Sequence, residues 1–215
     1  MISKFGLYRK SVQSGIILSV LYLIYFIGLV TSYSELFVAL SPIVFLLNTV
    51  LIIHNHREKK RPDKYYTALF IITILILAQL LVSNYISLAP KMDYLDILNT
   101  KLFKFPFMII VVILSGIITS ASLVERIRIS KTKKIFTAGI ITLGYEIIID
   151  SFARLIGLWK YTTDTSVVHI ILFFLFINFL SQGMFFYYDV WKFNKLALFN
   201  LLLHSFLLSL IFLFF

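Results

Sequence analysis

Three charged residues lie one helical turn apart in an apolar stretch that is long enough to cross a bilayer. Glu146, Asp150 and Arg154 occur between residues 137 and 161, within TAGIITLGYEIIIDSFARLIGLWKY, and a spanning helix needs about 20 residues. At about 100° per residue, positions four apart stay on one side of a helix. A charge at the bilayer centre costs at least ~2.5–3.5 kcal/mol. The pattern therefore predicts a buried acidic site.

Two carboxylates one turn apart in a low-dielectric environment are not expected to ionise together. Arg154 lies nearer to Asp150 than to Glu146 along the chain, so Asp150 is the expected anion and Glu146 the expected neutral acid. Such a pair can relay protons, bind a cation, or act as general acid and base. The chain has no H-E-x-x-H, Asp-rich or phosphate-binding glycine motif, so no metal site is predicted.

Polar side chains recur near the midplane of other apolar segments. Counted at about 1.5 Å per residue from the outer end of each segment, Asn178, Gln182 and His204 lie roughly as deep as Glu146. An imidazole titrates near neutral pH, so His204 is the expected base or orienting group. The predicted catalytic residues are Glu146, Asp150, Arg154 and His204, and the predicted substrate-binding residues are Asn178, Gln182, Gln79, Trp159 and Tyr161.

The same residues also have a structural interpretation. Hydrogen bonds of about 0.6 kcal/mol each join the helices of membrane bundles. For the amides and His204 taken singly, this role fits better than a functional one. For Glu146 and Asp150 the cost of burying two acids favours function.

The composition is that of a membrane protein. Of the 215 residues, 60% are hydrophobic and 14% charged, whereas a soluble domain is about half apolar and a quarter charged. The net charge of +10 comes from short basic clusters between apolar runs, which is a topology signal rather than a nucleic-acid site. The chain has no cysteine, so disulfides and thiolate chemistry are excluded.

The apolar runs predict an all-α, polytopic transmembrane bundle that forms a single membrane domain over residues 1–215. Its first run is long for a signal sequence and is followed by no small-x-small cleavage site, so we expect a retained helix. The seven predicted spans are about 12–30, 36–53, 66–88, 102–123, 135–158, 167–188 and 196–215.

The basic residues predict the orientation of these spans. Fifteen Lys and Arg fall at the N-terminus and in the second, fourth and sixth loops, whereas four fall in the other loops. Because basic loops remain in the cytoplasm, we expect a cell-membrane protein with a cytoplasmic N-terminus and an external C-terminus.

Two further expectations concern the surfaces around the acidic site. The helical arc opposite the acids carries Ile141, Ile148, Phe152 and Leu155, which are expected to face lipid, whereas Gly157 is expected to pack closely against a neighbour. Apolar residues at helical spacing in the segment 89–106 fit a short helix on the outer membrane surface, but an interfacial connector is the favoured interpretation.

One segment is similar to part of a known family. Asp150, Gly157, Trp159 and Tyr161 form D-x6-G-x-W-x-Y, which resembles a segment of the membrane lycopene cyclases and related hydratases of carotenoid pathways. The resemblance implies that an acidic pair in a helical bundle can protonate an apolar polyene. It covers about a dozen residues, and the Pro-x-Glu-Glu element of those cyclases is absent, so no catalytic residue is transferred.

Three functions remain open from the sequence. The first is a membrane-embedded enzyme acting on a lipid or isoprenoid, and the second is a small transporter coupled to protons or a cation. The third is a non-catalytic sensor or assembly protein. The expected partners are the lipid bilayer and a lipid-like or small-molecule ligand, with no nucleic acid. The residues identify no cofactor and leave the oligomeric state open.

Overall fold

The computed structural model describes most of the chain and is helical almost throughout. The described residues are 2–56, 62–85, 92–94, 101–102, 105–161, 167–189 and 194–214. They form seven α-helices and four short strands. The helices are α1 (Ile2–Leu29), α2 (Ser34–His56), α3 (Pro62–Tyr85), α4 (Phe107–Val124), α5 (Lys131–Leu155), α6 (Val167–Tyr187) and α7 (Lys195–Phe214). The strands are β1 (Met92–Tyr94), β2 (Lys101–Leu102), β3 (Phe105–Pro106) and β4 (Trp159–Tyr161).

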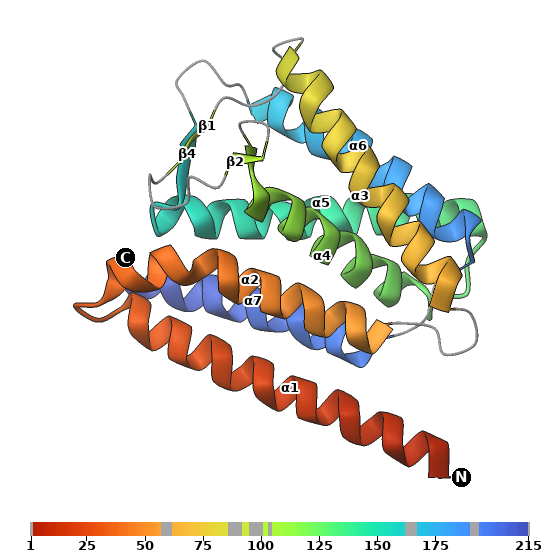
Figure 1. The fold of residues 1–215 in the computed structure, drawn as a ribbon, viewed down its shortest axis with the longest axis horizontal. Helices are drawn as coiled ribbons and strands as arrows, with labels where there is room; N and C mark the ends of the chain where they lie inside the picture. The colour runs from red at the N-terminus through yellow and green to blue at the C-terminus, as the bar shows by residue number, and fades with distance from the viewer. Residues whose placement is uncertain are drawn as a thin grey trace.

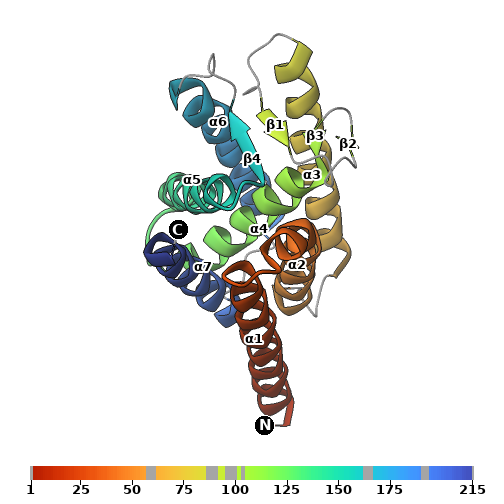
Figure 2. The same ribbon diagram turned by 90° about the vertical axis from the view of Figure 1, so that its left-hand side faces the viewer.

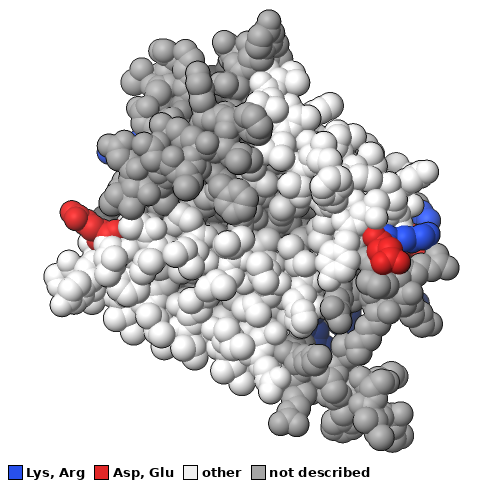
Figure 3. Space-filling view, in the orientation of Figure 1, with Lys and Arg blue, Asp and Glu red and all other residues white. Residues whose placement is uncertain are grey.

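Within the described residues, three helices are long and apolar enough to cross a membrane. These stretches are Val12–Leu29 in α1, Ser34–Asn55 in α2 and Lys131–Leu155 in α5. Shorter apolar stretches occur in α4, α6 and α7. On the face shown in Figure 3, the charged side chains of the described residues lie near the two ends, and uncharged surface fills the band between them. The helical structure and its three candidate spans indicate a membrane protein.

Helix α1 has one buried face and one exposed face. Leu18, Tyr22, Tyr25 and Leu29 are buried, whereas most of the large aliphatic residues between them are exposed. The buried residues recur every three or four positions and so form one stripe along the helix. Because the outer face of α1 is also apolar, lipid rather than water is its natural solvent. The exposed residues of this face are Val12, Ile16, Ile17, Val20, Leu23, Ile24 and Ile27.

Helix α4 lies at the centre of the bundle (Figures 1 and 2). It packs against α2, α3, α5, α6 and α7, and between Met108 and Val124 only Leu114 and Leu123 are not fully buried. Gly116 allows this close approach, because a Cβ there would lie 2.9 Å from the Tyr145 ring of α5. The central helix thus fixes the position of α5, which carries the acidic residues.

The turn between α4 and α5 fixes where α5 begins. Ser130 is the N-cap, and its hydroxyl accepts a hydrogen bond from the backbone N–H of Lys133 at 3.5 Å. An N-cap side chain satisfies an N–H group that the first helical turn leaves free. Lys134 reaches back to α4 and pairs with Glu125 at 3.2 Å. These contacts join the ends of the two helices.

A glycine turn ends α5, and it folds the following residues back against the last turns of this helix. Gly157 has φ of +77°, and Leu158 N–H donates to Ala153 O at 2.8 Å, which is a Schellman arrangement. A Cβ at Gly157 would meet nothing within 4 Å, so the expectation that this glycine packs against a neighbour is wrong. A side chain there is instead disfavoured by the left-handed backbone.

The described parts of the segment 89–106 form short strands rather than the alternative surface helix. β1 pairs antiparallel with β4, and β2 pairs with β3; residues 95–100 lie outside the described residues. Helix α4 begins directly after Pro106, whereas the predicted span began at residue 102. Backbone pairing between distant strands overrode the helical spacing, because it is set by the tertiary fold rather than by local sequence.

The predicted lipid-facing arc of α5 is also wrong in part. Phe152 is only 6% exposed, and its ring lies 6.3 Å from those of Tyr25 and Phe45. Leu155 is partly buried against the core. Since α4, α6 and α7 all pack against α5, only a narrow arc remains outside. That arc carries Phe136, Ile140 and Ile147, which are 55%, 63% and 47% exposed.

This arrangement gives a test of how α5 is oriented. Ile140→Ala should leave thermal stability in detergent nearly unchanged, because the side chain has few protein neighbours to lose. Leu155→Ala should destabilise the protein by on the order of 1 kcal/mol, as for a partly buried aliphatic residue. Unfolding curves of both variants check this, and the opposite ranking would contradict the orientation of α5.

Candidate functional site

Glu146 is the most deeply buried acid among the described residues. It is 2% exposed, and its Oε2 accepts a hydrogen bond from Nδ2 of Asn178 on α6 at 2.6 Å. Its second oxygen, Oε1, has no hydrogen-bond partner within the described part of the chain. A buried carboxyl oxygen without a partner is costly to maintain. It therefore identifies a position where a proton, a water or a ligand can be held.

A small cavity adjoins this carboxyl group. Its space accommodates about one water molecule, which is far less than a lipid chain requires. The two acids and the indole ring are the polar part of its wall, and the rest is hydrocarbon. The cavity is lined by Ile109, Val112, Ile113, Glu146, Asp150, Trp159 and Phe174.

Asp150 differs from Glu146 because its carboxylate has several donors. Oδ1 accepts hydrogen bonds from Trp159 Nε1 at 2.9 Å and from the Tyr161 hydroxyl at 2.6 Å. Oδ2 pairs with Arg154 Nε at 3.0 Å, and the Arg154 guanidinium also lies 5.7 Å from the Tyr161 ring centroid. This environment stabilises an ionised carboxylate. Asp150 thus holds β4 against the end of α5.

Strand β4, which supplies the Trp159 and Tyr161 donors, is paired with β1, a strand that precedes α4 in the chain. In the β1–β4 pair, Tyr94 is opposite Trp159 and Met92 is opposite Tyr161. The Gly157 turn directs the chain into this strand, which Figure 1 shows beside the end of α5. Two segments far apart in sequence, β1 and β4, therefore meet beside the cavity that Trp159 lines.

One turn from Glu146, towards the start of α5, a second polar cluster joins α4, α5 and α6. Thr142 and Ser120 form a hydrogen bond between their hydroxyls at 2.5 Å. Gln182 Nε2 donates to both hydroxyl oxygens at 3.0 Å and to Ile117 O at 3.1 Å. Thr142, Ser120 and Gln182 are all fully buried. We call these three residues the inner cluster.

A third network surrounds His204. Its Nε2 lies 2.5 Å from the Tyr22 hydroxyl of α1, and its Nδ1 lies 3.1 Å from the Tyr145 hydroxyl of α5. Tyr145 also contacts Ser115 at 3.1 Å and accepts from Asn200 Nδ2 at 3.3 Å. Both ring nitrogens of His204 thus have phenol partners, and the network connects α1, α4, α5 and α7.

The structure brings together only part of the predicted site. Glu146, Asp150 and Trp159 line one cavity, whereas His204 belongs to the tyrosine network and does not line it. Gln79 is half-buried on α3, which packs against α6 and α4, and it does not line the cavity either. Of the other predicted residues, Arg154 and Tyr161 bind Asp150, Asn178 binds Glu146, and Gln182 lies in the inner cluster.

Sequence reasoning missed the two tyrosines that hold His204. Tyr22 and Tyr145 are 1% exposed, but the chain has 12 tyrosines, and most positions in such a chain are explained by packing. Their only local signal is that each lies within an apolar helix. Since the contacts with His204 span 182 and 59 residues, no spacing rule could have found them.

Comparison with known proteins found no match. The chain matches no protein-family model, no curated protein and no solved structure. Among the described residues, no group of three or more His, Asp or Glu side chains could hold a metal ion.

Proposed function

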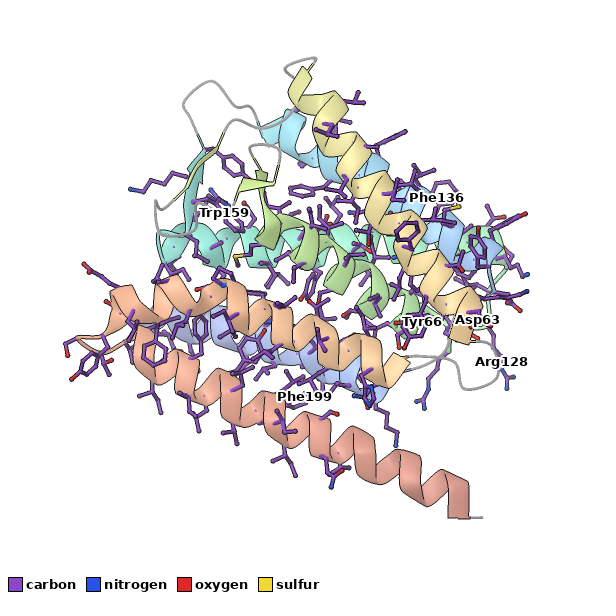
Figure 4. The ribbon with its side chains drawn as sticks, viewed as in Figure 1. Asp63, Tyr66, Arg128, Phe136, Trp159 and Phe199 are labelled. Atoms are coloured by element: carbon purple, nitrogen blue, oxygen red, sulfur yellow. The ribbon has the colours of Figure 1, made fainter. Side chains whose placement is uncertain are left out.

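We propose that this chain is a multi-pass protein of the cell membrane that crosses the bilayer seven times. The exposed basic side chains of the α4–α5 turn lie at the same end as the last turns of α2 and the beginning of α7, because Asn194 donates to Ile52 O at 3.2 Å and contacts Ser122. Arg128 and Trp159 lie at opposite ends of the bundle (Figure 4). Under the positive-inside rule the end with Arg128 is cytoplasmic.

Reporter fusions test this topology. Fusions at Lys60 and Lys131 should report the cytoplasm, and fusions at Asp96 and Phe215 should report the outside. A cytoplasmic signal at Phe215 would contradict an odd number of spans. The seven-span arrangement would then have to lose one helix.

Within this topology we propose proton transfer as the function, with Glu146 as the residue that takes up and releases the proton. The observation that carries this proposal is the unpartnered Glu146 Oε1 beside a cavity of one-water size. A carboxyl group surrounded by hydrocarbon is most stable when neutral. A proton or a single water molecule fits the space, whereas a larger substrate does not.

The distribution of buried polar groups supports a transporter over an enzyme. A conduit needs polar residues at several depths, whereas an enzyme needs one pocket. Here Asp150, Glu146 and Thr142 follow one another at successive turns of α5, and the last two have partners on α6. Beyond Thr142 the next turn of α5 presents the buried residue Ala138. The polar side chains of α5 thus follow one another as far as Thr142.

An enzyme that protonates a lipid or isoprenoid is the second candidate. The observation in its favour is the hydrocarbon lining supplied by Val112, Ile113 and Phe174. A substrate could reach Glu146 only if β4 moved away and enlarged the cavity. Mass spectrometry of co-purifying lipids would identify such a ligand.

The transport proposal is tested with purified protein in liposomes. A pH gradient is imposed across the vesicles, and its decay is followed with an enclosed pH-sensitive dye. The protein should accelerate the decay relative to protein-free vesicles, and added sodium or potassium shows whether a cation is exchanged. Equal decay with and without protein under all these conditions would contradict transport and favour the enzyme.

A further inference from the structure

The two acids of α5 share one cavity, although their hydrogen-bond partners differ. Glu146 and Asp150 both line the space of one-water size beside Trp159. Glu146 Oε1 has no hydrogen-bond partner among the described residues, so it does not bond to Asp150 directly. A small polar space holds a water molecule where at least two polar groups can bind it. The two carboxyl groups in the wall of this cavity supply that number.

Asn178 determines which oxygen of Glu146 carries the proton. Its Nδ2 donates to Glu146 Oε2 at 2.6 Å, and Asn178 itself does not line the cavity. A neutral carboxyl group has one oxygen that donates through its hydrogen atom and one that only accepts. Since Oε2 accepts from the amide, the proton of neutral Glu146 belongs on Oε1. Glu146 thus offers a donor to a water in the cavity.

The Asp150 carboxylate has room for one more donor. An ionised carboxylate has about four acceptor positions on its two oxygens. Oδ1 accepts from Trp159 and Tyr161, and Oδ2 pairs with Arg154. Within the described part of the chain, these three donors leave one acceptor position on Oδ2. A cavity water that accepts from Glu146 can therefore donate to Asp150.

The exposure of the neighbouring residues indicates the direction in which a proton can leave Glu146. Towards the end of α5, the side chains of Asp150 and Arg154 are 13% and 49% exposed. Towards the start of α5, Thr142 and Ala138 are fully buried. Protons cross hydrocarbon along chains of polar groups. Asp150 is therefore the group of α5 that connects the buried acid with the surroundings.

We propose that Asp150 is the outer proton acceptor of this site and that a cavity water joins it to Glu146. This inference rests on the proposed role of Glu146. Glu146 Oε1 releases its proton to the water oxygen while the water passes one of its own protons to Asp150 Oδ2. Glu146 becomes the anion, Asp150 becomes neutral, and the water is unchanged. Asp150 then releases its proton to external water, and the reverse steps return a proton to Glu146, so that one proton serves both acids.

Hydrogen–deuterium exchange of the Glu146 carboxyl group tests this route. The protonated carboxyl band is followed by infrared spectroscopy after rapid mixing with D2O and is assigned by its loss in Glu146→Gln. Asp150→Asn should slow the exchange by about tenfold or more, because an amide cannot carry the proton. Asp150→Glu retains a carboxyl group, so it should exchange faster than Asp150→Asn.

These two substitutions separate proton transfer from a structural role of Asp150. Asparagine has the shape of aspartate, whereas glutamate is one methylene longer, so a purely structural role would favour Asp150→Asn. If Asp150→Glu exchanges no faster than Asp150→Asn, or if Asp150→Asn exchanges within about twofold of the wild type, Asp150 is not the acceptor. Absence of the band in the wild type would instead refute the proposed role of Glu146 itself.

Val112→Ile tests the water. Val112 lines the cavity, and the added methyl group takes the room that a water needs, so exchange should slow by about tenfold or more although both acids remain. Val111→Ile is the matched control, because Val111 is a buried valine of the same helix that does not line the cavity. It should exchange like the wild type. Since both changes overpack the interior, equal rates in the two variants would overturn the water link.

Discussion

Glu146→Gln should abolish protein-dependent proton flux into liposomes while leaving the protein folded. The glutamine side chain has nearly the same shape and can still accept the hydrogen bond from Asn178, which reaches Glu146 at 2.6 Å. A glutamine side chain cannot release or bind a proton near neutral pH. Flux should therefore fall to the level of protein-free vesicles, and thermal stability in detergent should stay close to that of the wild type.

Glu125→Gln is the control for this variant. Glu125 is an acid of the same size that lies at the end of α4, pairs with Lys134 and is partly exposed. Its neutralisation removes one negative charge from the protein without touching the cavity, so flux should be unchanged. Full flux in Glu146→Gln would show that the proton passes elsewhere. Loss of flux in both variants would point to a general effect of charge.

Asp150→Ala should cause a large loss of stability. The substitution removes the acceptor of three donors, namely the Trp159 indole, the Tyr161 hydroxyl and the Arg154 guanidinium. Leaving one member of a buried ion pair alone costs about 3–5 kcal/mol. Because the Arg154 side chain is 49% exposed, part of this cost is relieved by the surroundings, and the lower end of the range is expected.

Asp150→Asn separates the charge from the hydrogen bonds. Its Oδ1 can still accept from Trp159 and Tyr161, but its amide meets the Arg154 donor, so a smaller loss of about 1–3 kcal/mol is expected. The control is Glu35→Gln on the exposed start of α2, which should change stability by less than about 0.5 kcal/mol. If Asp150→Asn and Glu146→Gln are equally stable, the two acids do not have different roles.

The relations that the sequence predicted correctly are local ones. The prediction of a helical bundle is confirmed. The four-residue spacing of the acids and Arg154 placed Arg154 beside Asp150, because helix geometry fixes neighbours at this separation. Depth counting also placed Asn178 near Glu146, since antiparallel neighbouring helices bring residues of equal depth together. The structure shows this contact directly.

The relations that the sequence could not predict depend on distant contacts. Phe152 faces inward because α4, α6 and α7 surround α5. In an apolar helix the lipid-facing and the buried arcs have the same composition, so the sequence could not distinguish them. The pairing of β1 with β4 overrode a local helical pattern. His204 was assigned to the acidic site by depth alone, but the rotation of α7 directs it to Tyr22 and Tyr145.

The central claim is that Glu146 holds an exchangeable proton inside the membrane while Asp150 is ionised. Infrared spectroscopy of the purified protein tests it most directly, because a protonated carboxyl group gives a band that a carboxylate lacks. We expect a protonated band at neutral pH that disappears in Glu146→Gln and persists in Asp150→Asn. A band that is absent from the wild type, or one that disappears in Asp150→Asn and persists in Glu146→Gln, would contradict it.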